Sequence, residues 1–159
     1  MPISLDSIDR QIIALLVRDG RASAATLSRA LGDVSERTVR YRIERLLRGD
    51  VMRVSAVVSP QALGYRIIAD VFIEVAAGQV GEVARRLAEC EHVSYVAASI
   101  GESDLSIQVC ARDEGELAHI VGDVVGPIPG VRRTRTVLVP WKLKDVYEWQ
   151  IPPALADVT

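Results

Sequence analysis

The spacing of apolar residues changes once along this 159-residue chain, and that change constrains the fold more than any other feature. Before residue 50, three segments place their apolar residues at the three- and four-residue intervals of amphipathic helices. After residue 65, apolar and polar residues alternate in short runs, which indicates β-strands separated by further helices. The sequence therefore predicts a helical part followed by a mixed α and β part.

Each of the three N-terminal segments has the start and stop signals of a helix. A capping side chain precedes each one, and a glycine follows it. A short helix, a four-residue turn and a basic amphipathic helix form a helix-turn-helix, whose second helix enters the DNA major groove. The capping residues are Asp6, Ser23 and Ser35, and the terminating glycines are Gly20, Gly32 and Gly49.

Positive charge is concentrated in the third helical segment, although the whole chain has a formal net charge of -2. Residues 1–54 contain ten arginines and seven acidic residues, whereas the remainder contains nine basic and fourteen acidic residues. Five of the arginines lie between residues 37 and 48, within about three helical turns. Such a stripe suits a polyanion, and a solvated helix face is the alternative interpretation.

The outward side of this third helix supplies candidate DNA contacts. Arg37 and Arg40 are predicted to read bases, because a guanidinium can bridge guanine O6 and N7. Hydroxyl groups at the helix start and arginines at its end suit phosphates. In an alternative interpretation, Glu36 and Glu44 hold neighbouring arginines in intrahelical pairs, and Arg42 lies nearer the buried edge. The candidate DNA-binding residues are Ser35, Arg37, Thr38, Arg40, Tyr41, Arg45 and Arg48.

The segments after residue 65 follow the order strand, helix, strand, strand, helix, strand. That order predicts an α+β protein: a helix-turn-helix domain, with a wing strand at 51–58, followed by a ferredoxin-like βαββαβ domain. One sheet face lacks helices, so it faces solvent or a second protomer. Ile68 and Phe72 suit protomer pairing, and an ordinary core position is the alternative for both. The expected segments are 67–75, 79–89, 93–100, 105–111, 114–125 and 131–139.

The predicted division of the chain has four parts. They are a DNA-binding domain at 1–54, a linker at 55–64, the βαββαβ domain at 65–141 and a tail at 142–159. Cys90 and Cys110 form neither a Cys-x-x-Cys motif nor a zinc-ligand set, so no metal and no cofactor is expected. No apolar run reaches the roughly 18 residues of a membrane span, and no signal peptide opens the chain, so a cytoplasmic location away from membranes is expected.

Short motifs in both halves together resemble the Lrp/AsnC family of leucine-responsive and asparagine-synthetase regulators. Their joint order and spacing are specific, and they extend over residues 5–144. In that family a helix-turn-helix domain precedes a RAM domain, named for the regulation of amino-acid metabolism. The motifs are Leu5-Asp6-x-Ile8-Asp9-Arg10, Asp19-Gly20-Arg21, Ser35-Glu36-Arg37-Thr38-Val39-Arg40-x-Arg42-Ile43, Gly101-x-x-Asp104-Leu105, Arg112-Asp113, Pro129-Gly130-Val131 and Thr134-x-Thr136.

The resemblance implies a nucleoid-associated transcription regulator that binds double-stranded DNA. Members of the family dimerise through their sheets, often form octamers, and sense a small molecule, usually an amino acid. Their effector lies between dimers near a Gly-x-x-Asp loop, which places the expected effector site at Gly101, Glu102, Ser103 and Asp104. A plain hairpin turn is the alternative for this loop. The family usually has a glycine where Asp50 stands.

Two other function classes stay open at this point. Siroheme decarboxylases share the two-part fold, so an enzyme that binds a tetrapyrrole is one alternative. The two histidines, His92 and His119, have no catalytic constellation around them in the sequence, and the chain is expected not to be an enzyme. A DNA-architectural protein, which binds widely with little sequence preference, is the other alternative.

Overall fold

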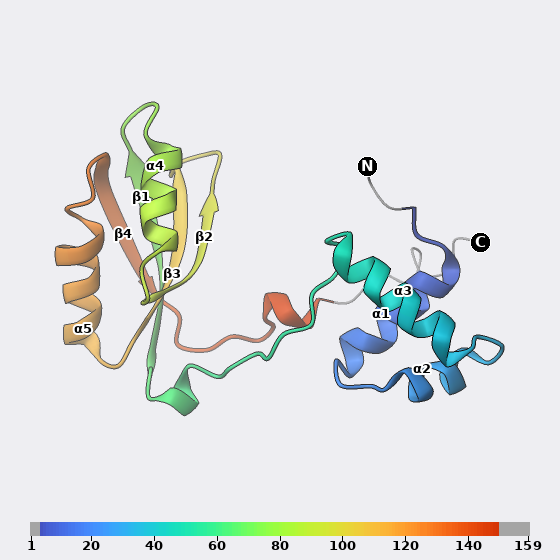
Figure 1. Cartoon of the computed structure of the whole chain (residues 1–159). Coiled ribbons are helices and arrows are strands. Elements are labelled where there is room, and N and C mark those ends of the chain that lie inside the picture. The colour runs from blue at the N-terminus through green and yellow to red at the C-terminus, as the bar shows by residue number, and fades with distance from the viewer. Residues whose placement is uncertain (1–3, 150–159) are drawn as a thin grey trace. The chain divides into compact units, whose positions relative to one another are not determined.

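The computed structural model describes residues 4–149, which form two compact units. The first unit comprises residues 4–57 and 144–149, and the second comprises Val58–Leu143. Helices make up the first unit, whereas the second contains a sheet with helices packed on it (Figure 1). Among the described residues, no helix combines the length and the apolar character that a membrane span requires.

Three helices enclose a small apolar core in the first unit. The helices are α1 (Ser7–Arg18), α2 (Ala24–Leu31) and α3 (Glu36–Arg48). Ile12 and Ile13 of α1 pack with Leu46 of α3, and partly buried neighbours complete the cluster. Leu27 of α2 and Val39 of α3 are also buried. The order of helices is the predicted helix-turn-helix order.

The predicted capping residues begin all three helices. Asp6 and Asp9 form a capping box, in which each carboxylate accepts a hydrogen bond from the other's backbone N–H. Ser23 and Ser35 cap α2 and α3 by accepting from the N–H three residues later. The local signals in the sequence therefore determine where these helices start.

The predicted wing strand is absent from the described residues. Residues 51–58 follow α3 without forming a strand, and Val54, Val57 and Val58 are exposed. Their β-branched side chains favour an extended backbone, but a strand also needs a neighbour with which to exchange hydrogen bonds. The first unit offers no such neighbour within the range that the structure describes.

The second unit has the predicted ferredoxin-like order. Its elements are β1 (Ile67–Val75), α4 (Val80–Ala88), β2 (Val93–Ala98), β3 (Leu105–Ala111), α5 (Glu114–His119) and β4 (Val131–Leu138). The strands pair antiparallel in the order β2-β3-β1-β4. Both helices cover the same face of the sheet (Figure 1).

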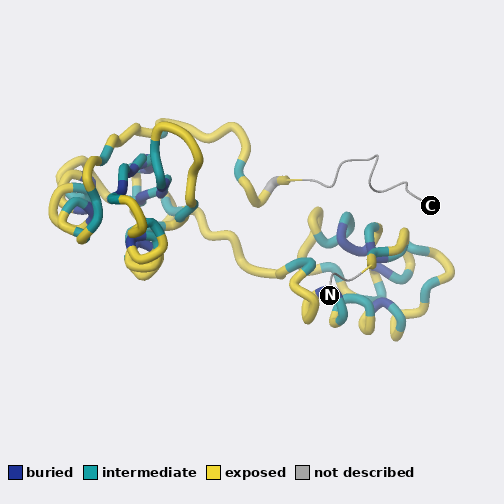
Figure 2. Tube along the Cα trace, turned by 90° about the horizontal axis from the view of Figure 1, so that it is seen from above, coloured by how far each residue is buried: buried dark blue, intermediate teal, exposed yellow. Residues whose placement is uncertain are grey.

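A large apolar core lies between the sheet and its two helices. Alternate residues of the two central strands point into it, as the two-residue period of a strand requires. Figure 2 shows the buried part of the trace gathered at the centre of this unit. The core residues are Ala69, Val71, Ile73, Val75, Val83, Leu87, Leu105, Ile107, Val109, Ala111, Leu117, Ile120 and Val125.

The helix expected over 114–125 changes its winding halfway. The α-helical part ends at His119, and Ile120–Val125 form a π-helical turn. The N–H of Gly126 donates to the carbonyl of Val121, five residues earlier, at 2.9 Å. A Cβ at Gly126 would lie 3.0 Å from the carbonyl oxygen of Gly122, so glycine permits this closely packed turn.

The open face of the sheet carries polar and charged side chains beside its apolar ones. Ile68 is only 5% exposed, although it is not one of the residues of the core between the sheet and its helices. Phe72 lies beneath the guanidinium of Arg135, 4.5 Å from the ring centroid. The side chain of Gln108 donates to Asp70 across the neighbouring strands at 3.2 Å.

Candidate nucleic-acid interface

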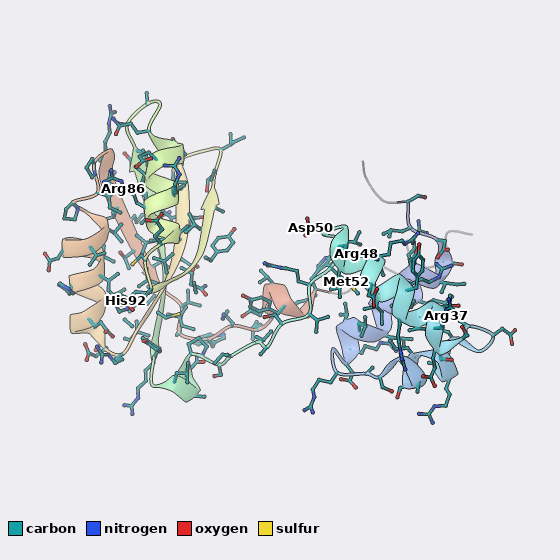
Figure 3. All side chains as sticks on the ribbon, in the orientation of Figure 1. Arg37, Arg48, Asp50, Met52, Arg86 and His92 are labelled. Atoms are coloured by element: carbon teal, nitrogen blue, oxygen red, sulfur yellow. The ribbon has the colours of Figure 1, made fainter. Side chains whose placement is uncertain are left out.

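The outward side of α3 presents a basic surface with one aromatic residue. Tyr41 is 60% exposed, and a shallow depression beside it is lined by α3 residues alone. Figure 3 marks Arg37 near the start of the helix and Arg48 near its end. No ion pair of Arg37 occurs among the described residues, in contrast to Arg40 and Arg48. The residues that line the depression are Glu36, Arg37, Arg40, Tyr41 and Glu44.

The N-terminus of α3 places two hydroxyl groups beside its first backbone amides. Oγ of Ser35 accepts from the N–H of Thr38 at 3.2 Å, and the two hydroxyl groups lie 2.9 Å apart. The first amides of a helix have no partners within the helix, and its dipole favours a negative charge there. This end of α3 is therefore chemically suited to a phosphate.

Two exposed arginines of α3 are held in the intrahelical pairs that the alternative interpretation anticipated. Arg40 and Glu36 lie 3.1 Å apart, and Arg48 and Glu44 lie 3.9 Å apart. Exposed pairs of this kind stabilise a helix by about 0.3–0.5 kcal/mol. A bidentate contact with guanine is worth about 1–3 kcal/mol of base discrimination. The pairs are weak enough for Arg40 and Arg48 to exchange them for contacts with DNA.

Arg42 and Arg45 point toward α1 instead. Nη1 of Arg42 donates to the carboxylate of Asp6 at 2.6 and 2.8 Å and to Oδ1 of Asp9 at 2.9 Å. Nη2 of Arg45 pairs with Oδ2 of Asp9, a side chain with no exposed area. Removing one partner of a buried ion pair costs about 3–5 kcal/mol of stability. A hydrogen bond to a charged group, such as a DNA phosphate, contributes about 1.5–3 kcal/mol. A phosphate contact would therefore not offset the loss of the pair with Asp9. The side chain of Arg45, which was predicted to contact the DNA backbone, is held against α1 in this structure.

The contact with Arg42 also changes the titration of Asp6. A guanidinium hydrogen bond, reinforced by the backbone N–H of Asp9, lowers the pKa of Asp6 to about 2. The same hydrogen bond raises the pKa of Arg42. Both groups are therefore fully charged at neutral pH, and the placement of Arg42 near the buried edge of α3 is confirmed.

Sequence reasoning did not identify the structural partners of these two arginines. Asp9 could be recognised only as the acidic member of the capping box, because that role depends on neighbours three residues away. Its second role depends on residues 33 and 36 positions later in the chain. An acid at the third position of α1 gives no local sign of which residues it will meet after folding.

The predicted effector loop joins β2 to β3 and is fastened to β1. The N–H of Asp104 donates to the carbonyl of Ile73 at 3.0 Å, and its Oδ2 accepts from the N–H of Val75 at 2.7 Å. Gly101 has a φ of +147° with open space around it, and Glu102 is exposed. The loop is thus the connection of an antiparallel hairpin. One oxygen of Asp104 is occupied by the protein itself, and the effector role of the loop stays a prediction.

Two further observations concern the chemistry of the described residues. They contain no group of three or more His, Cys, Asp and Glu side chains arranged to hold a metal ion. Cys90 and Cys110 are both free thiols and are half-buried. Neither observation points to a site beyond the two considered above.

Comparisons with known proteins agree with both parts of this fold. A model of the AsnC-type helix-turn-helix domain matches residues 5–47, and a model of the Lrp/AsnC ligand binding domain matches residues 68–148. The HTH-type transcriptional regulator FL11 of Pyrococcus abyssi is 38% identical over 152 residues, which cover 95% of this chain and 99% of the relative.

Solved structures with the same fold include two regulators. The leucine response regulatory protein LrpA of Mycobacterium tuberculosis has a TM-score of 0.81 and 28% identity over 93% of this chain and 100% of its own. A Neisseria meningitidis transcriptional regulator in complex with L-Met has a TM-score of 0.82 and 23% identity over 89% of this chain and 94% of its own. The relatives give no support to a tetrapyrrole enzyme or an architectural protein. The chain belongs to the Lrp/AsnC family of helix-turn-helix transcriptional regulators.

Proposed function

We propose that this protein is an oligomeric regulator that binds specific DNA sites through the outward side of α3 and responds to an amino-acid effector. The observation that carries the DNA-binding part is the sorting of the α3 arginines. Arg37, Arg40 and Arg48 face solvent beside Tyr41, whereas Arg42 and Arg45 are held against α1. Only the first group can reach a duplex without breaking a contact to a buried acid.

Within this surface the residues have different tasks. Arg37 and Arg40, near the start of α3, read bases in the major groove, where the first turns of a recognition helix lie. Arg48 and the hydroxyl groups of Ser35, Thr38 and Tyr41 bind phosphates and fix the register of the helix on the duplex.

Two copies of the chain form the DNA-binding species. A dimer places two recognition helices on half-sites separated by about 34–36 Å, one turn of DNA. The sheet face that carries no helix is the surface through which the copies pair, and larger assemblies such as octamers are built from these dimers. The support is the uncovered sheet face and the family to which the chain belongs.

The effector binds at the loop of residues 101–104. Gly101 leaves the backbone accessible, Glu102 and Ser103 supply polar groups, and Asp104 holds the loop to the end of β1. Adjacent amides suit an α-carboxylate and an acidic side chain suits an ammonium, which together define an amino acid. A ligand-binding family model matched to this unit supports the proposal, and so does the binding of L-Met by a protein of the same fold.

Equilibrium DNA binding tests the DNA-binding part of the proposal. Duplexes selected from random DNA by the full-length protein would be compared with scrambled duplexes of the same composition, over a range of salt concentrations. A preference for the selected duplex and a log–log salt slope of about -0.9 per phosphate contact are expected. Equal binding to both duplexes would overturn the specific regulator in favour of an architectural protein.

A second titration with pooled amino acids tests the effector site. Affinity for the selected duplex is expected to change with the pool present, and Gly101→Val is expected to abolish that change while DNA binding without effector persists. Gly122→Ala, which adds a Cβ in open space in the same unit, is the matched control. A response that survives in Gly101→Val would remove the effector site from this loop.

A further inference from the structure

Asp9 has an environment that its capping role does not explain. Among the described residues it is the only polar or charged residue that is buried, and its side chain has no exposed area. Burial of an ionised carboxylate is unfavourable unless it is paired and hydrogen-bonded. Asp9 meets this condition by contacts with two guanidinium groups of α3.

These contacts form a group of four charges between α1 and α3. Asp6 and Asp9 contribute two carboxylates from the start of α1, and Arg42 and Arg45 contribute two guanidinium groups from α3. The group has no net charge. Two of the five arginines of α3 are thereby neutralised, with their guanidinium groups directed to the acids of α1.

Arg45 is the less firmly held of the two arginines. Its side chain is 34% exposed, against 19% for Arg42, and its Nε is buried without an acceptor among residues 4–149. Arg45 is held through Asp9, whereas Arg42 also contacts Asp6. It lies one helical turn from both Tyr41 and Arg48, at the border of the outward side.

From this arrangement we infer that Asp9 is a specificity-determining positioning residue for DNA recognition. It fixes α3 against α1 so that Arg37 and Arg40 face the duplex in one orientation. It also keeps the guanidinium of Arg45 from making a phosphate contact that would strengthen binding to every sequence alike. The inference depends on the proposed DNA-binding function, because it concerns which arginines of α3 that function uses.

Asp9→Asn tests the inference, because it removes the charge and keeps the size of the side chain. With Arg45 released, binding to a scrambled duplex is expected to strengthen, and the salt slope is expected to steepen by about 0.9. The ratio of affinities for selected and scrambled duplexes is expected to fall about tenfold. A purely structural role for Asp9 would leave the slope and the ratio of the folded protein unchanged, and that result would overturn the inference.

The double variant Asp9→Asn with Arg45→Met identifies the released charge. Its salt slope is expected to return to that of the wild-type protein. A slope that stays steep would mean that Arg45 is not the residue released, which contradicts the inference. Asp19→Asn is the matched control, since Asp19 ends α1 and its side chain accepts from the N–H of Arg21 rather than from an α3 arginine. This control is expected to keep both the slope and the ratio.

If Asp9→Asn does not fold, the single variant Arg45→Met still tests the inference. Arg45 is partly exposed, so its replacement is expected to leave the protein folded. The inference states that Arg45 makes no phosphate contact in the wild-type protein, so its removal is expected to leave the salt slope unchanged. A slope reduced by about 0.9 would place Arg45 on the DNA and overturn the inference. Absence of DNA binding by the wild-type protein would instead refute the proposed function itself.

Discussion

The two units of this chain are stabilised in different ways. Within residues 4–149, the first unit buries five apolar residues and one acid, which pairs with arginines of a neighbouring helix. In the same range, the second unit buries thirteen apolar residues between a sheet and two helices. A small helical unit has little apolar area to remove from water, because the fraction of surface that a domain buries on folding falls as the domain becomes smaller.

Charged side chains have different roles in the two units. In the first, ion pairs connect Arg42 and Arg45 of α3 to acids of α1, whereas no ion pair of Arg37 occurs among the described residues. In the second, the residues that hold the fold are apolar, and polar side chains such as Gln108 and Asp70 lie on the open face of the sheet. A basic stripe in a sequence therefore overstates the charge available to a partner wherever a buried acid faces it.

The largest expected effect on stability comes from a Leu→Ala substitution in each of the two cores. Leu105→Ala in the sheet core and Leu46→Ala in the helical core remove the same atoms from fully buried sites. We expect Leu105→Ala to lower the free energy of unfolding by about 4 kcal/mol and Leu46→Ala by about 2–3 kcal/mol, because a small core relaxes into a cavity more completely. Urea unfolding with hydrogen exchange of peptides from each unit measures both. A larger loss for Leu46→Ala would break the comparison.

Acid destabilises the first unit through Asp6. Its pKa lies at about 2 in the folded protein, below the usual 3.8, so its contribution to stability is present above pH 4 and is lost as the pH falls toward 2. The full shift corresponds to about 2 kcal/mol, and solvent screening reduces it to about 1 kcal/mol because the side chain is 53% exposed.

Asp6→Asn is the variant that measures this contribution, because asparagine keeps the cap and cannot titrate. Between pH 4 and pH 2 the first unit of the variant is expected to lose less stability than that of the wild-type protein. Glu116 of the second unit has a pKa lowered to about 2 by its hydrogen bonds with Arg112, so the second unit is expected to respond equally in both proteins. Equal acid sensitivity of the first unit in both proteins would contradict the role of the Asp6–Arg42 pair.

The smallest expected effect on stability concerns Asp50, the second residue after α3. Asp50 has a φ of +53°, the one positive value at a non-glycine residue in the described part of the chain. Asp50→Gly is expected to raise the free energy of unfolding of the first unit by about 0.5 kcal/mol, because relief of backbone strain exceeds the added entropy of the unfolded chain. Asp33→Gly, at an exposed position without a positive φ, is the control and is expected not to stabilise. Thermal unfolding of both variants decides the point.

Local signals account for most of what could be predicted from the sequence. The capping side chains of Asp6, Ser23 and Ser35 begin helices as expected, since a cap depends on residues three positions away. The alternation of apolar and polar residues over Ile67–Val75 predicted the central strand, because one buried face imposes a period of two residues.

Features that depend on distant partners could not be predicted. The segment 51–58 looks like a strand by composition but has no neighbour to pair with in its unit. The π-helical turn at Ile120–Val125 follows the same apolar pattern as an α-helix, so the pattern cannot distinguish them. The ion pair of Asp9 with Arg45 joins residues 36 positions apart, and sequence alone assigned that arginine to DNA.

The sorting of the α3 arginines is tested most directly by comparing Arg37→Ala with Arg42→Ala in DNA binding and in thermal unfolding. Arg37→Ala is expected to weaken binding to the selected duplex by about 1–3 kcal/mol with an unchanged Tm. Arg42→Ala is expected to lower the Tm of the first unit, while the folded protein keeps the wild-type salt slope. The opposite pattern, with Arg37 important for stability and Arg42 for the salt slope, would contradict the account.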